Sequence, residues 1–315
     1  MPRTGRFPAP NTGLPYLVFR TTPRDRYLAA MVFEHRVLTS DQIAQLAFTT
    51  LRRANRRLAE LTELGIVDRT RANPAVYGSC PYLYTLGPQG ALLVAAERDK
   101  SVKELRYDRA VLQRQAVRPD LPHSLGCNTV MVRLATRHRT APDTRLRSWW
   151  GPLNSMSAWM DVIRPDAYAV TTDETNPTAA HSRFGWFFEY DTGTESINQL
   201  ARKTHGYHRF SQNRPGTYPA LIRVPNPARE ARLHEVIAEI FPGTCPIPLA
   251  TTSSDDLGAQ VWRIAGDPSL PTAAHAAPRH RLAALGHAFA ALGYRLMEPT
   301  DRHDQEIPAP AWDQP

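Results

Sequence analysis

Cysteine is scarce in this sequence, and a long apolar run is missing from it. The three cysteines, Cys80, Cys127 and Cys245, are odd in number and widely spaced. That pattern excludes a disulfide framework and a zinc site with paired ligands, so we expect buried, reduced thiols. No stretch approaches the roughly 18 apolar residues of a membrane helix, and no basic, apolar leader opens the chain. We therefore expect neither membrane insertion nor secretion, and we expect a cytoplasmic protein.

Lysine is almost missing from the basic residues. The chain carries 38 Lys and Arg, of which only Lys100, Lys103 and Lys203 are lysines. A lysine kept in such a background suggests a task that arginine performs poorly, because a compact ammonium differs from a broad, always charged guanidinium. Chance retention is the alternative explanation.

The charge balance is basic and unevenly distributed. The chain has a formal net charge of +8 and a sequence pI near 9.7. Residues 1–72 hold 12 Arg against 6 Asp plus Glu, so +6 of this charge lies in the first quarter of the chain. This distribution favours an anionic partner for the N-terminal part. The length of 315 residues, 42% of them hydrophobic, predicts about two domains.

The N-terminal part of the chain has the pattern of three helices followed by a hairpin. Apolar residues at helical spacing predict one helix from about residue 24 and a second that Thr39 or Ser40 caps. A third helix over residues 51–64 has leucines on one side and Gly65 as its stop. Two strands at 66–71 and 82–86, joined by a turn with Pro and Gly, form the hairpin. This order is typical of a winged helix-turn-helix.

The third helix is the predicted DNA-recognition helix. Its basic and polar residues crowd the N-terminal half, where such helices meet base edges and phosphates of double-stranded DNA. The alternative is that these arginines form only a solvated face. The residues that we expect to contact DNA are Thr49, Thr50, Arg52, Arg53, Asn55, Arg56 and Arg57.

The second half of the chain predicts an αβββαβ core with extensions. After a mainly helical stretch at 87–120, we expect the following elements: a helix at 123–138, strands at 145–150, 162–170 and 184–191, a helix at 193–210, a strand at 218–224, a helix at 228–240 and a last strand at 247–251. A Pro and Ala-rich linker at 266–278 and a terminal helix at 279–296 follow, and the remaining end is expected to be disordered.

These patterns divide the chain into five parts. The expected divisions are a flexible leader at 1–23, a winged helix domain at 24–98, a helical linker at 99–122, a second domain at 123–265, and a linker, terminal helix and disordered tail at 266–315. The expected fold class is therefore α/β or α+β.

Acidic side chains and the lone lysine of the second half indicate a site. Glu189 and Asp191 lie two residues apart on a predicted strand, so both project to the same face. Asp166 lies on a neighbouring predicted strand, and Lys203 on the helix that follows. Hard oxygen ligands for a divalent cation and one positive charge are what a magnesium-dependent phosphodiester hydrolase requires. The alternative is that these acids lie at the solvent-exposed ends of the strands and only keep those ends soluble.

Other polar residues lie near Lys203 on the same predicted helix. Gln199 and Tyr207 fall one turn before and one turn after Lys203, on a polar face. Glu195 lies three positions after Thr192, which fits a capping box, so we interpret Glu195 as structural. Thr194 is an equally good candidate for the cap.

The sequence resembles the replication-relaxation family of actinobacterial plasmids and integrative elements. The resemblance rests on a predicted winged helix followed by three motifs: Arg164-Pro-Asp166, then Glu189-Tyr-Asp191 with Thr192-Gly-Thr-Glu195, then Lys203 with Tyr207. That family is similar to a branch of the PD-(D/E)XK nuclease superfamily, so the resemblance implies a restriction-endonuclease-like core for the second domain. It covers about residues 25–250. The sequence departs from the superfamily pattern in one respect, because Asp191 stands where lysine is expected and the lysine appears instead at Lys203.

The resemblance implies a role for each of these residues. Asp166 and Glu189 would ligate Mg²⁺, Asp191 would add a ligand or orient water, and Lys203 would stabilise the pentavalent phosphate. Gln199 and Tyr207 would position the phosphate or the lysine. Replication or conjugation proteins are expected partners, and a homodimer is a further expectation because winged helices often act as dimers.

Three functions remain open at this level. The first is a metal-dependent endonuclease or nicking protein that acts on mobile-element DNA. The second is a sequence-specific DNA-binding regulator or accessory replication protein whose nuclease fold has lost catalysis. The third is a relaxase with Tyr207 as nucleophile, which the sequence favours least because His205-Gly-Tyr-His208 lacks the expected histidine spacing.

Overall fold

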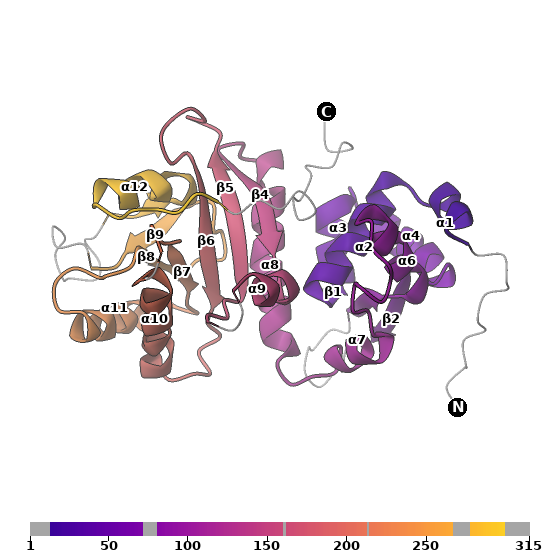
Figure 1. Ribbon diagram of the computed structural model, residues 1–315, viewed down its shortest axis with the longest axis horizontal. Coiled ribbons are helices and arrows are strands. Elements are labelled where there is room, and N and C mark those ends of the chain that lie inside the picture. Colours follow the sequence, from indigo (N-terminus) through magenta and orange to yellow (C-terminus); the bar gives the residue numbers. More distant parts are fainter. Residues whose placement is uncertain (1–12, 72–80, 160–161, 213, 267–277, 300–315) are drawn as a thin grey trace. The chain divides into compact units, whose positions relative to one another are not determined.

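A computed structural model of the chain describes residues 13–71, 81–159, 162–212, 214–266 and 278–299. These residues form a mixed α/β protein, as predicted (Figure 1). They divide into two compact units, and the division falls between Leu125 and Gly126, inside helix α8 (Leu121–Thr136). Within the described ranges, no helix is both long and apolar enough to cross a membrane.

Unit 1 combines helices with a small antiparallel sheet. Its elements before α8 are α1 (Leu14–Arg20), α2 (Pro23–His35), β1 (Leu38–Thr39), α3 (Ser40–Ala47), α4 (Leu51–Glu63), β2 (Val67–Arg71), β3 (Tyr82–Leu86), α6 (Pro88–Glu97) and α7 (Arg109–Gln115). The three strands pair in the order β1-β3-β2, with β3 antiparallel to both neighbours. The predicted strand at 82–86 is confirmed, and the turn predicted before it lies outside the described residues.

The helix ends of unit 1 follow the capping signals in the sequence. Thr39 caps α3 in a capping box with Gln42: the Thr39 hydroxyl accepts from the Gln42 amide at 3.1 Å, and the Gln42 side chain accepts from the Thr39 amide at 2.9 Å. Gly65 adopts a φ of +70° just after α4, which is a conformation that glycine reaches without strain. The predicted cap and stop are thus confirmed.

The leader predicted for residues 1–23 is wrong over its last part. Residues 14–20 form α1, which begins after Gly13 with Pro15 in its first turn, where proline is tolerated. Leu17 is fully buried, and α1 packs on α6. A helix of two turns with one buried residue carries too little periodicity to be recognised from sequence.

Unit 2 is built on one mixed sheet of seven strands. After α8 and a short 3₁₀ turn at Arg137–Arg139, its elements are β4 (Thr144–Trp150), α9 (Pro152–Trp159), β5 (Ala167–Asp173), β6 (Arg183–Tyr190), α10 (Ile197–Gln212), β7 (Ala220–Arg223), α11 (Pro227–Ile240), β8 (Leu249–Thr252), β9 (Gln260–Ile264), β10 (His280–Arg281), a 3₁₀ turn at Leu282–Ala284 and α12 (Leu285–Ala291). The strand order is β10-β9-β8-β7-β6-β5-β4. The pairs β6-β7 and β7-β8 are parallel, and the others are antiparallel.

The parallel pairs explain where the helices of unit 2 lie. A parallel connection requires a crossover, and α10 and α11 supply the crossovers between β6, β7 and β8. Both helices pack side by side on the same face of the sheet (Figure 1). Their apolar residues meet an aromatic core in which Tyr168, Phe187 and Tyr218 contact one another edge-on or tilted, with ring centroids 5.1 to 5.9 Å apart.

Several predicted elements of unit 2 need correction. The strand predicted at 162–170 begins only at Ala167, because Pro165 cannot donate to a strand ladder. Helix α9 was not predicted, and β8 is not the last strand, since β9 and β10 follow it. The terminal helix predicted at 279–296 is reduced to α12, with β10 and a 3₁₀ turn before it.

Two further predictions concern the thiols and the C-terminal part of the chain. Cys127 and Cys245 are buried and unpaired with other thiols, as predicted, whereas Cys80 lies outside the described residues. Most of the predicted 266–278 linker and the end of the chain from residue 300 also lie outside them.

Candidate active site

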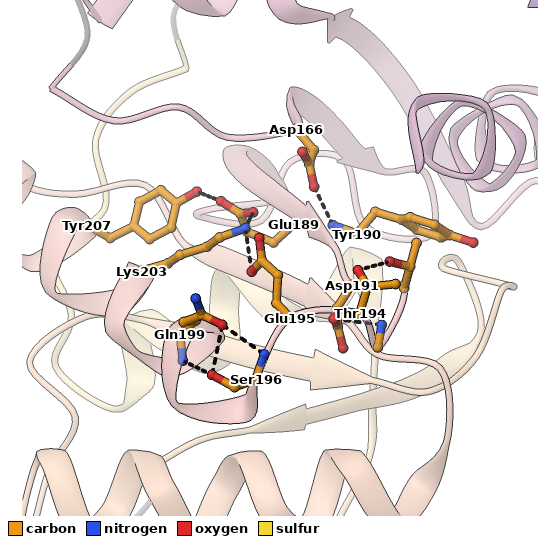
Figure 2. Close-up of polar contacts among 12 residues, drawn as sticks. Asp166, Glu189, Tyr190, Asp191, Thr194, Glu195, Ser196, Gln199, Lys203 and Tyr207 are labelled. Carbon is orange, nitrogen blue, oxygen red and sulfur yellow. Dashed lines mark hydrogen bonds and ion pairs between the residues drawn. The ribbon is translucent and has the colours of Figure 1, made fainter. Parts of the chain in front are cut away.

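Asp166 and Glu189 lie at the same edge and on the same face of the sheet of unit 2. The antiparallel register pairs Ala167 with Phe188, so Asp166, one residue earlier, stands opposite Glu189, one residue later. An Asp166 carboxylate oxygen accepts the Tyr190 amide at 2.8 Å, which fixes Asp166 against the end of β6 (Figure 2). The predicted meeting of these two acids therefore occurs, although β5 begins one residue after Asp166.

Helix α10 brings Lys203 and Tyr207 to Glu189. The Lys203 ammonium lies 3.1 Å from Glu189 Oε2, and the Tyr207 hydroxyl donates to Glu189 Oε1 (Figure 2). Phe187, two residues before Glu189, stacks on the Tyr207 ring at 5.3 Å. Glu189 is only 3% exposed and Tyr207 only 4% exposed, whereas the Lys203 side chain is 37% exposed. The cluster thus has a buried carboxylate and one cation that reaches the surface.

The burial of Tyr207 weighs against the tyrosine-nucleophile hypothesis. A nucleophile must reach the scissile phosphate, yet the Tyr207 hydroxyl is enclosed and already donates to Glu189. Burial and the negative charge of Glu189 raise the pKa of Tyr207 well above its usual value, which keeps the phenol protonated. Tyr207 is therefore suited to orienting Glu189.

Burial dominates the electrostatics of the cluster. Desolvation, followed by repulsion from Asp166, raises the pKa of Glu189 to about 7, against the opposing effects of Lys203 and Tyr207. Burial lowers the pKa of Lys203, but the attraction of Glu189 and Asp166 outweighs it and raises that pKa above its usual value. Lys203 is thus a permanent cation beside a carboxyl group that titrates near neutrality.

Glu195 belongs to the cluster, which corrects its interpretation as a cap. Its Oε2 lies 3.5 Å from the Lys203 ammonium, so Lys203 stands between Glu189 and Glu195 (Figure 2). The capping box at the start of α10 is made by Ser196 and Gln199: Ser196 accepts from the Gln199 amide at 3.3 Å, and Gln199 Oε1 accepts from the Ser196 amide at 3.0 Å. This contact gives Gln199 a structural role.

Asp191 lies on the same face of the sheet but is engaged by another helix. Both oxygens of its carboxylate accept from the Arg229 guanidinium of α11, and Oδ1 also accepts the Gly193 amide at 2.9 Å. Arg229 additionally donates to the Glu195 carbonyl at 2.7 Å. Gly193 has a φ of +84°, which permits the turn between β6 and α10. This buried ion pair gives Asp191 a structural explanation, and its role as a metal ligand stays a prediction.

Asp166 and Glu189 are the carboxylates of this cluster that could hold a divalent cation. Within the part of the chain that the structure describes, no group of three or more His, Cys, Asp or Glu gathers closely enough to hold a metal ion. Mg²⁺ binds commonly through one or two carboxylates, with waters and substrate phosphates completing its shell. Asp166 and Glu189 supply such a pair. Burial is the main cause of the raised pKa of Glu189, and repulsion from Asp166, which a cation would relieve, adds to it. The pair therefore fits Mg²⁺.

Glu189 should make the stability of the protein depend on pH. A carboxyl group whose pKa rises from 4.5 to about 7 on folding favours the folded state when it is protonated, and this contribution is lost as the pH rises from 4.5 through 7. As the pH rises from 4.5 to 8, the free energy of unfolding of Glu189→Gln should therefore increase by about 1 to 3 kcal/mol relative to that of the wild type. Thermal unfolding across this range measures the difference, with the exposed Glu235→Gln as control. A constant difference at all pH values would contradict the assignment.

Helix α4 is the second candidate site. Arg52, Arg53, Asn55 and Arg56 are exposed on it, as DNA contact requires. Arg57 instead turns inward and pairs with Asp25, which is 1% exposed, through bonds of 3.1 and 2.8 Å. The Thr50 hydroxyl caps the helix by accepting from the Arg53 amide, and the Thr49 hydroxyl accepts from the Arg53 side chain at 3.3 Å. These contacts give Thr49, Thr50 and Arg57 structural explanations, and their contact with DNA stays a prediction.

Sequence reasoning missed two partners of the acidic residues. Glu195 was interpreted as part of a cap because Thr192-x-x-Glu195 fits the capping pattern, which Ser196-x-x-Gln199 fits as well. Arg229 carries no local signal, because its partner Asp191 lies 38 residues away along the chain. The Arg229 contact depends on the packing of α10 and α11 side by side, and the Glu195 contact depends on how the loop before α10 turns toward Lys203.

Fold and site together define a mixed α/β protein with a lysine and carboxylate cluster at the edge of its larger sheet. The family model described as replication-relaxation matches residues 30–221, which is more than half of the chain. The protein therefore belongs to the replication-relaxation family. Comparisons with curated proteins and with solved structures give no match.

Proposed function

We propose that this protein is a magnesium-dependent DNA endonuclease or nicking protein that acts in the replication or relaxation of plasmid or mobile-element DNA. The observation that carries this proposal is the Lys203 ammonium, which lies 3.1 Å from the buried Glu189 and is attracted by the charge of Asp166 at the same end of the strands. Family membership supports the biological setting. The chemistry rests on the site alone.

The residues of the cluster divide the work of phosphodiester hydrolysis. Asp166 and Glu189 would hold Mg²⁺, which supplies Lewis acidity and lowers the pKa of a bound water. Lys203 would neutralise the charge that develops on the scissile phosphate, because it is the partly exposed cation of the cluster. Tyr207 orients Glu189 by donating to one of its oxygens. Glu195 holds the ammonium from its outer side.

The proposal extends to the architecture of both units. Unit 1 would be a winged helix-turn-helix with α4 as recognition helix, which the order of α2, β1, α3, α4 and the β2-β3 hairpin supports. Unit 2 would be a PD-(D/E)XK-like core, which the order of α8, β4, β5, β6, α10 and β7 supports. Exposed Arg52 and Arg56 would bring the protein to its DNA site.

A DNA-binding regulator without catalysis is the second candidate. Two observations favour it: Asp191 is fully engaged by Arg229, and both oxygens of Glu189 already accept hydrogen bonds. A site satisfied by its own side chains is also what a nuclease fold would retain after losing its metal. The regulator would use α4 in the same way.

Supercoiled plasmid separates the two candidates. The full-length protein should convert it to nicked or linear product in the presence of Mg²⁺ and leave it intact with EDTA. Salt is held constant, because phosphate contacts weaken steeply with ionic strength. No conversion over several plasmids, together with retained binding, would overturn the enzyme and favour the regulator.

A further inference from the structure

The outer face of α10 carries a stripe of polar and basic side chains. Residues at the spacing i, i+4, i+7, i+11 and i+14 share one side of a helix. On α10 these are the exposed residues Asn198, Arg202, His205, Arg209 and Gln212. The stripe lies on the same helix as Lys203, which points from a neighbouring face toward Glu189 (Figure 2).

The charge of this stripe has one sign and is not neutralised. Helix α10 contains no Asp or Glu over its 16 residues. Among the described residues, neither Arg202 nor Arg209 has an ion-pair or hydrogen-bond partner. The neighbouring helix α11 differs, since its arginines pair: Arg229 with Asp191, and Arg232 with Glu235. Exposed cations that lack carboxylate partners are suited to an anionic ligand.

We propose that this face of α10 binds the phosphate backbone of DNA and forms a contact surface in unit 2 in addition to α4. Arg202 and Arg209 lie seven residues apart, which is about 10 Å along the helix axis. That length corresponds to about three nucleotide steps of one strand. Asn198, His205 and Gln212 add polar groups between and beyond the two arginines.

The proposed surface deepens the proposed function by naming how unit 2 would hold its substrate. We expect this surface to contact phosphates and not base edges. Within the described part of the chain, the guanidinium groups of Arg202 and Arg209 have no partner that fixes their orientation, so they act as positive charges and do not recognise particular bases. The contact would keep a DNA strand along the helix that carries Lys203. It predicts binding whether or not the chain cleaves DNA, so the two ideas fail separately.

Salt-dependent DNA binding tests this surface. The full-length protein with R202A and R209A is compared with a matched R133A/R232A variant, which removes two exposed arginines that do have partners, Asp255 and Glu235. Both sets are repeated in an R52A/R56A background, where binding through α4 is weakened. The probes are a duplex and a single-stranded oligonucleotide of arbitrary sequence.

The expected result is a smaller salt slope. For the duplex, the slope of log K against log salt should fall by about 1 to 2 in R202A/R209A, and affinity near physiological salt should fall about tenfold or more. The slope for the matched R133A/R232A variant should stay within about 0.5 of the slope for the protein without either pair of substitutions. Equal slopes in both variants and with both probes would overturn the proposal, and circular dichroism verifies that each variant is folded.

Discussion

Lys203→Ala should lower Mg²⁺-dependent plasmid nicking about 100- to 1,000-fold while DNA binding stays near the wild-type level. The loss follows from the proposed mechanism, in which the Lys203 ammonium neutralises charge on the phosphate, and no other lysine lies in unit 2. Asp166→Asn should lower nicking to a similar degree by removing a hard oxygen ligand. Nicking of supercoiled plasmid and binding to a labelled duplex measure the two properties separately.

Two controls make the result specific. Lys103→Ala removes an exposed lysine of unit 1 and should leave nicking unchanged. Lys203→Arg keeps the charge but replaces a compact ammonium with a planar guanidinium, so it should recover only part of the activity. Wild-type nicking in both Lys203→Ala and Asp166→Asn would show that the cluster does not perform the chemistry.

Replacing Lys203 should affect the stability of the fold as well as activity. Its ammonium is attracted by Glu189 and Glu195, and without it the two carboxylates lose their shared counter-ion. Since the Lys203 side chain is partly exposed, solvent screens part of that change. Activities are therefore best compared at a temperature well below the unfolding midpoint of each variant.

Local signals in the sequence were enough to predict much of the framework. The aromatic and apolar run at 82–86 predicted β3, the Thr39 pattern predicted the start of α3, and Gly65 predicted the end of α4. These predictions hold because each depends on residues next to one another. The residues around Asp166 show the limit, since Pro165 delays the start of β5 within an otherwise apolar run.

The candidate site was predictable where strand geometry alone decides it. Asp166 and Glu189 meet because neighbouring strands set their spacing, and Lys203 returns to them on the next helix. The capping role of Gln199 was not predictable in this way, because Thr192-x-x-Glu195 and Ser196-x-x-Gln199 both fit the capping pattern for the same helix. Tertiary contacts decide it: Arg229 holds the Glu195 carbonyl, while the Glu195 carboxylate turns to Lys203.

Asp191 is the residue for which structure and resemblance point to different roles. The resemblance implies a metal ligand or a group that orients water. The structure gives a carboxylate that is 2% exposed and accepts from Arg229 and from the Gly193 amide, in the loop that leads into α10. The structural role predicts a loss of stability on substitution, whereas the ligand role predicts a loss of metal affinity.

Asp191→Asn should lower the free energy of unfolding by about 3 to 5 kcal/mol, because it leaves the Arg229 charge without its partner in a largely buried position. The double variant D191N/R229Q should recover much of this loss, since it removes both charges. Asp120→Asn breaks the exposed pair with Arg118 and should change stability by at most about 1 kcal/mol. Urea unfolding of these variants and of the wild type measures the differences, and the single R229Q variant completes a double-mutant cycle that isolates the pair.

Magnesium titration of nicking completes the test of Asp191. If the carboxylate serves only the ion pair, D191N at low temperature should require the same Mg²⁺ concentration for half-maximal nicking as the wild type. A shift of tenfold or more in that concentration, with stability unchanged, would assign Asp191 to the metal and make the Arg229 contact secondary. The two roles differ physically because a buried ion pair stabilises the fold whether or not a cation is bound, whereas a ligand acts only through the cation.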